Sequence, residues 1–100
     1  MCFLFVVLVA EQVAFIGHPT QLLCGKAKGD TTDWMYQSPE HSQRRRISGN
    51  GTVSSHHNGR YATNGSSLVI NEVKASDAGF YICGHGRQVY HKLRLCVSGM

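Results

Sequence analysis

The sequence lacks an apolar run long enough to cross a membrane. Its longest, residues 1–10, is uncharged and almost wholly apolar, whereas a membrane-spanning helix needs about 20 such residues. Because Glu11 and Gln12 follow directly, we expect a secretory signal peptide that is cut near Ala10, with a buried first strand as the alternative. The signal is imperfect, since Leu8 is large for its position and the usual basic start is missing, as in a truncated signal. Any membrane attachment would depend on segments absent from this chain.

Charge is also scarce. Ten Lys and Arg against six Asp and Glu give a net charge of +4, and no stretch interleaves basic with aromatic residues in the manner of a nucleic-acid-binding face. We therefore expect no nucleic-acid partner. An apolar content of 42% is typical of a folded protein. A chain of 100 residues holds one domain at most, which we place at residues 11–98.

Motifs for catalysis, metal binding and nucleotide binding are missing as well. There is no Gly-x-Ser-x-Gly nucleophile motif. The segments 84–86 and 49–51 have a Gly-x-Gly pattern but lack the third glycine of a dinucleotide loop. The six histidines, including adjacent His56 and His57, show no zinc-site spacing. The sequence thus predicts a protein that is not an enzyme and that has no cofactor, no metal and no catalytic residues.

Helical periodicity is absent too. Short apolar runs alternate with Gly, Pro, Asn and Asp, a pattern typical of an all-β sandwich or barrel. We expect strands at residues 13–16, 20–25, 32–37, 43–47, 60–63, 67–73, 80–84 and 89–97.

Three features of the sequence together fit a two-sheet sandwich. Cys24 and Cys83 each lie on the apolar face of an expected strand, and Trp34 follows Cys24 on a strand of its own. The third feature is the motif Asp77-x-Gly79-x-Tyr81-x-Cys83, in which the tyrosine precedes the cysteine by two positions.

At these residues the sequence resembles the immunoglobulin superfamily, from about residue 17 to residue 97. Residues 17–24 are similar to the approach to strand B of that family, residues 34–39 to strand C of its variable-type domains, and residues 67–73 to strand E. The resemblance implies an immunoglobulin-like Greek-key β-sandwich, with two antiparallel sheets joined by a Cys24–Cys83 disulfide. A bridge over a loop of this length contributes roughly 4 kcal/mol in the chain-entropy model. The implied core consists of Trp34, Tyr81, Leu22, Leu68 and Ile70.

The subtype stays open between variable-type and intermediate-type domains. The two cysteines are close together for a full variable domain, and the Phe-Gly-x-Gly signature is absent, which excludes an ordinary rearranged antigen receptor. The chain is more similar to domains of innate immune receptors or of small secreted immunoglobulin-domain proteins. The resemblance also implies an ion pair between Arg60 and Asp77, the alternative being two separately solvated charges.

The implied function is non-catalytic recognition. Arg44, Arg45 and Arg46 suggest a basic patch for sialylated glycans, heparan sulfate or an acidic protein, because planar guanidinium groups suit carboxylate and sulfate. The alternative is a solvated strand face. The family's layout places a hairpin tip with His85 and Arg87, and the loop 26–31, beside this strand. We expect a protein or glycan ligand in immune recognition or cell adhesion. The alternative is an assembly domain of a larger receptor that pairs, as a homodimer or heterodimer, with another immunoglobulin domain.

Two N-glycosylation sequons agree with export of the protein. They begin at Asn50 and Asn64, and both lie in polar, Gly-rich stretches. Together with the signal and the cysteines, they predict a glycoprotein that is secreted or displayed on the extracellular face of the plasma membrane.

Cys96 has no obvious role in this scheme. In residues 92–97 the alternation places Leu93, Leu95 and Val97 inward and Cys96 outward. Cys2 would leave with the signal, so we expect Cys96 to be an outward, unpaired thiol that can bridge to another molecule. A benign unpaired thiol, or a partner cysteine lost by truncation, is the alternative.

Overall fold

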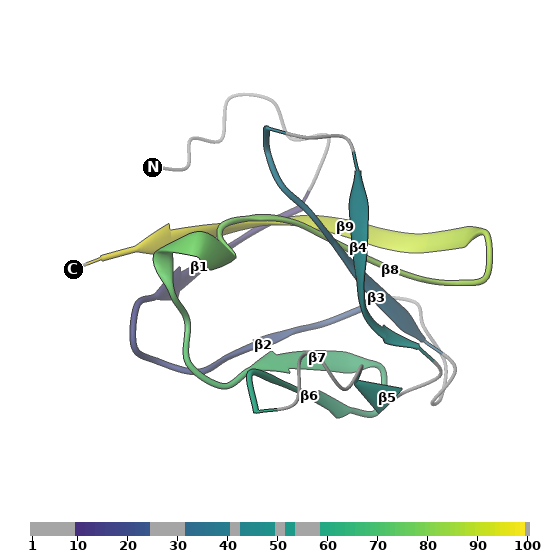
Figure 1. Cartoon of the computed structure of the whole chain (residues 1–100), viewed down its shortest axis with the longest axis horizontal. Coiled ribbons are helices and arrows are strands. Elements are labelled where there is room, and N and C mark those ends of the chain that lie inside the picture. The colour runs from purple at the N-terminus through teal and green to yellow at the C-terminus, as the bar shows by residue number, and fades with distance from the viewer. Residues whose placement is uncertain (1–9, 25–31, 41–42, 50–51, 54–58, 100) are drawn as a thin grey trace.

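The chain forms two packed β-sheets. The computed structural model describes residues 10–24, 32–40, 43–49, 52–53 and 59–99. The larger sheet has the strand order β1-β9-β8-β3-β4-β5 and the smaller one the order β2-β7-β6. Figure 1 shows the smaller sheet and β5 on one side and the long β8–β9 hairpin on the other. The strands are β1 Ala10–Phe15, β2 Thr20–Leu22, β3 Asp33–Gln37, β4 Arg44–Gly49, β5 Thr52–Val53, β6 Tyr61–Asn64, β7 Ser67–Ile70, β8 Gly79–His85 and β9 Gln88–Ser98, with one 3-10 turn, η2 Ala75–Asp77.

This arrangement is the expected immunoglobulin-like Greek-key β-sandwich, with one correction. The expected antiparallel pairing holds in the smaller sheet, but β1 pairs with β9 in parallel, so the larger sheet is mixed. After β1 the chain turns at Gly17, which has a positive φ of 87°, and crosses to β2 in the other sheet. The Gly17 N–H donates to the carbonyl of Val73 at 2.9 Å, which fixes the crossing against the base of the sandwich.

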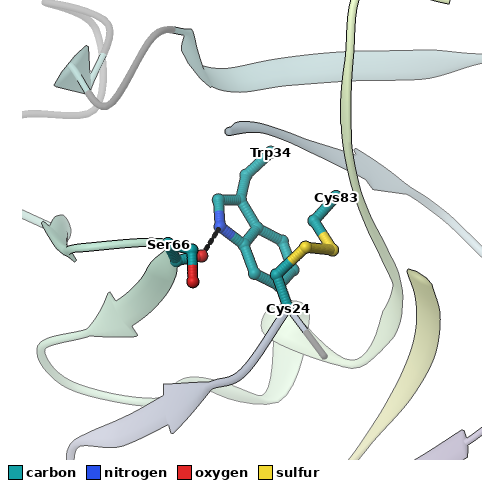
Figure 2. Close-up of a disulfide and its surroundings, with 4 residues drawn as sticks. All are labelled: Cys24, Trp34, Ser66 and Cys83. Atoms are coloured by element: carbon teal, nitrogen blue, oxygen red, sulfur yellow. Dashed lines mark hydrogen bonds between the residues drawn. A yellow bond between two sulfur atoms is a disulfide. The ribbon is translucent and has the colours of Figure 1, made fainter. Parts of the chain in front are cut away.

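The core lies between the sheets, around the expected disulfide. Cys24 and Cys83 are joined, with their Cα atoms 5.9 Å apart. Figure 2 shows the Trp34 indole beside this bridge, with its Nε1–H donating to the Ser66 carbonyl at 3.0 Å. The bond satisfies the polar edge of an indole that is otherwise buried. All five residues expected in the core are at most 1% exposed, namely Trp34, Tyr81, Leu22, Leu68 and Ile70.

The expected strands are present, but their limits differ. Strand β7 ends at Ile70, and Val73 reaches the core only after a bend. Strand β5, with only Thr52 and Val53, was not predicted, because two residues within a polar, Gly-rich stretch carry no alternation to detect.

The base of the sandwich is closed by a group that we call the base corner: Arg60, Tyr61, Asp77 and Tyr81. The Arg60–Asp77 pair is present, with guanidinium–carboxylate distances of 2.8 and 3.2 Å. The same carboxylate accepts the Lys74 N–H at 2.8 Å, while the Tyr81 hydroxyl donates to the Asp77 carbonyl at 2.7 Å. Asp77 is only 3% exposed. Each polar group of Asp77 is therefore satisfied as it is buried, which lets the corner fold without an unpaired charge.

Candidate ligand-binding surface

The three consecutive arginines lie on β4, which we call the arginine strand, but they do not share a face. Side chains at directly paired positions of neighbouring strands lie on the same side of a sheet. Arg44 is paired with Gln37 and Arg46 with Met35, whereas Arg45 is paired with Tyr36. Tyr36 packs against the core, so Arg45 lies on the inner side of the sheet at its rim, while Arg44 and Arg46 lie on the outer face. The single basic patch expected from the sequence is split in two.

Each arginine has a different environment. The Arg44 Nε–H donates weakly to Gln37 Oε1 at 3.4 Å, and the Arg45 guanidinium lies over the Tyr36 ring at 5.1 Å. The Arg46 guanidinium lies over Gly49, where a Cβ would come within 2.7 Å of Arg46 Nη1. Within the described part of the chain, no Asp or Glu forms an ion pair with any of the three.

The hairpin tip with His85 and Arg87 is exposed, but it lies at the other end of β3 from Arg44. Asp33 is paired with Gly84 next to the tip, whereas Gln37, the neighbour of Arg44, is paired with Phe80. Four strand residues separate these points, or about 13 Å. The expectation that the tip adjoins the arginine strand is therefore wrong for Arg44. The loop 26–31 lies outside the described residues.

Other basic side chains on the outer face are already engaged. Lys92 and Arg94 lie on β9, at the positions that the alternation had placed outward. The Lys92 ammonium lies over the Phe80 ring at 4.8 Å, and Arg94 approaches Glu11 at 3.8 Å. Of the cations described on this face, Arg44 and Arg46 are thus the ones that keep accessible donors for a partner.

A pocket of about 340 Å³ opens where β3 turns into β4. Its lining consists of Tyr36, Ser38, Gln43, Arg44 and Arg45. Burial raises the pKa of Tyr36, and Arg45 opposes this rise by favouring the phenolate. Two of these residues, Arg44 and Arg45, were predicted to bind ligand. The contributions of Tyr36, Ser38 and Gln43 were not predicted, because they depend on how the turn folds against the strand.

The expectation of a free, outward thiol at Cys96 is wrong. Cys96 is only 6% exposed and is disulfide-bonded, with a partner outside the described residues. The alternation gave the correct side, since Cys96 is not part of the central core cluster. It could not show that β1 adds beside β9 and places Val13 opposite Cys96. Cys96 is therefore unsuited to bridging with another molecule.

The sequon at Asn64 is accessible in the described structure. Asn64 is exposed at the end of β6, next to a two-residue turn in which Gly65 has a φ of 64°. The carbonyl of Ser66, the third residue of the sequon, is held by the Trp34 indole. The sequon is thus anchored to the core while its acceptor side chain faces solvent. Asn50 lies outside the described residues.

No helix in the described parts of the chain is long and apolar enough to span a membrane. Among the same residues, no cluster of three or more His, Cys, Asp or Glu side chains could hold a metal ion. No protein-family model matches the chain, and no curated protein matches it either. What the chain does must therefore be argued from its own residues.

Proposed function

We propose that the chain is an extracellular, non-catalytic recognition module of the immunoglobulin type, which binds a protein or glycan ligand in immune recognition or cell adhesion. The observation that supports this proposal is the arginine strand. It presents three arginines without carboxylate partners in the described structure, on a sandwich held rigid by a disulfide. Binding residues on a rigid scaffold lose little backbone conformational entropy when a ligand binds.

The compartment is argued from the covalent structure. A disulfide indicates an oxidising environment such as the extracellular space. A signal peptide cut after Ala10 does not fit the disulfide of Cys96, because the cut would remove Cys2, the only cysteine of the sequence besides Cys24, Cys83 and Cys96. Secretion and glycosylation of Asn64 belong to the proposal. Both can be tested by the intact mass of the secreted protein, before and after glycosidase treatment and before and after reduction.

Three exposed charges on one strand also have a purely structural explanation, a solvated strand edge. That explanation predicts no ligand, so a direct binding experiment separates the two. The domain would be displayed in many copies on one carrier, because multivalency raises the apparent affinity of weak sites. Binding would then be measured to intact cells and to cells treated with sialidase, heparinase or trypsin.

The decisive variant changes all three arginines to serine. We expect at least a tenfold loss of cell binding, with the thermal midpoint changed little because the side chains are exposed. A matched control changes His85 and Arg87 to serine at the hairpin tip, about 13 Å along β3 from Arg44, and is expected to retain binding. Undiminished binding by the arginine variant would refute the proposal.

The alternative of an assembly domain that pairs through Cys96 is not carried forward. It needs an accessible thiol, and Cys96 is buried and already bonded.

A further inference from the structure

The pocket between β3 and β4 assigns a ligand class to the proposed function, on which this inference rests. We infer that Arg44 and Arg45 jointly bind the carboxylate of a terminal acidic sugar, while Ser38 and Gln43 contact its hydroxyl groups. Arg46 stays outside this pocket and does not contribute.

The first step of the argument concerns charge. Arg44 and Arg45 leave β4 on opposite sides of the sheet, yet both line the pocket at the start of this strand, and neither forms an ion pair with a described carboxylate. The two arginines that do form ion pairs, Arg60 and Arg94, lie elsewhere. An anion in the pocket would gain charge-assisted hydrogen bonds without displacing an internal partner.

The second step concerns rigidity. Arg45 lies over the Tyr36 ring. Two contacts hold that ring in place. Its hydroxyl donates to the Ala78 carbonyl at 2.6 Å, and the Tyr36 and Tyr81 rings form an edge-type contact with their centroids 5.2 Å apart. Arg44 is steadied through its Nε by Gln37, which leaves its terminal nitrogens available. Both cations are thus partly positioned before a ligand binds.

The third step concerns the ligand class. At about 340 Å³ the pocket is at the lower end of the roughly 300–1,000 Å³ of small-molecule sites, a size suited to a single sugar unit. Ser38 and Gln43 both donate and accept hydrogen bonds, as ring hydroxyls require. Tyr36 is the single aromatic residue of the lining, and Arg45 already covers one face of it. The preference for a sugar over an acidic peptide therefore rests on Ser38 and Gln43, whose side chains can pair with ring hydroxyls.

One acidic side chain, Glu40, lies on the turn beside the pocket. Its carboxylate is close enough to act on the Tyr36 hydroxyl, and it is exposed. It would repel a bound carboxylate, so the change Glu40→Gln should tighten binding of an acidic sugar by about two- to threefold.

The test is a titration of the isotopically labelled domain, followed by NMR. The probes are the methyl glycoside of N-acetylneuraminic acid, methyl glucuronide, neutral lactose and hexaglutamate. We expect the acidic sugars to shift the amides of Ser38 and Gln43–Arg45, and lactose to shift none of them. The first two probes distinguish a sialate source from a uronate source.

Three variants complete the design. Arg44→Gln and Arg45→Gln should each weaken binding of the acidic sugar about tenfold, whereas Arg46→Gln, with the same charge change on the same strand, should weaken it less than twofold. An equal loss with Arg46→Gln would mean a diffuse basic surface and would overturn the inference. Tighter binding of hexaglutamate at the same amides would overturn it in favour of an acidic protein.

The inference can fail while the proposed function stands. If no acidic sugar shifts these amides, yet the multivalent domain binds cells and loses that binding with the arginine-to-serine variant, only the sugar assignment is wrong. If the multivalent domain binds no cells and the sugars bind nowhere, the recognition function itself is refuted.

Discussion

Arg60 and Arg45 lie at the same end of the sandwich, and each guanidinium sits over a tyrosine ring, at 5.4 Å from Tyr61 and 5.1 Å from Tyr36. Both cations are close enough to act on the Tyr61 hydroxyl. Their surroundings differ in one respect. Arg60 has a buried carboxylate partner in Asp77, and Arg45 has none among the described residues. The charge of Arg60 is thus paired within the fold, while the arginine strand is where we propose that a partner binds.

The same comparison separates an arginine that is paired within the fold from those that we propose bind a ligand. A satisfied ion pair next to the buried Tyr81 hydroxyl cannot change without a cost in stability, because the remaining charge is left in a poorly solvated site. An exposed guanidinium stacked on a ring contributes only about 0.5–1 kcal/mol. Substitutions in the two regions should therefore affect different measurements, stability in one and binding in the other.

The largest expected effect comes from breaking the base corner with Asp77→Ala. The change removes both bonds to Arg60 and the acceptor for the Lys74 N–H. Because Arg60 is about a third exposed and can turn toward solvent, we expect a loss of about 2–3 kcal/mol, below the roughly 3–5 kcal/mol of a broken, fully buried pair. Urea unfolding would measure it.

Binding to cells or sugars by the folded fraction of the Asp77→Ala protein should be unchanged. Normal stability in this variant would contradict the division between the two regions, and so would a selective loss of binding.

Alkaline pH should weaken the base corner next. Burial, with the charge of Asp77 and the neighbouring tyrosines in support, raises the pKa of Tyr81 far above its ordinary value. In the unfolded chain the hydroxyl ionises near pH 10, whereas in the folded chain it stays neutral. The stabilising contribution is complete below pH 10 and is lost as the pH rises above it, at about 1.4 kcal/mol per pH unit.

The measurement is unfolding by urea at pH 9, 10 and 11, for the native sequence and for Tyr81→Phe. The phenylalanine variant cannot ionise at this position, so its stability should fall less steeply between pH 10 and pH 11. Parallel curves for the two proteins would show that Tyr81 is not responsible for the alkaline loss.

The base corner could be predicted from the sequence better than the binding surface could. The motif around Asp77, Tyr81 and Cys83 is local, and the contacts it implies either are short-range or follow from the two-sheet sandwich expected from the sequence. The core was likewise predictable, since Leu68 and Ile70 alternate cleanly in a strand that is buried on one face.

The binding surface depends on register, which the sequence does not show. The run of three arginines looks continuous, but pairing with β3 sends Arg45 to the opposite side from Arg44 and Arg46. Cys96 shows the same limit. Alternation predicted its side of the sheet but not its burial, because the parallel addition of β1 to β9 is a long-range event without a local signal.

The smallest expected effect on stability comes from Arg45→Gln, and it sharpens the comparison most. The change removes a cation from over the Tyr36 ring but leaves no carboxylate unpaired, so we expect a loss of less than about 1 kcal/mol. Arg60→Gln is the matched control, since it also removes a cation from over a tyrosine ring but leaves the buried carboxylate of Asp77 without its ion-pair partner. The Arg60→Gln variant should lose more free energy of unfolding in urea than Arg45→Gln, while its binding stays intact. If Arg45→Gln proved as destabilising as Arg60→Gln, Arg45 would be a structural residue. That result would contradict the inference that the pocket beside it binds a ligand.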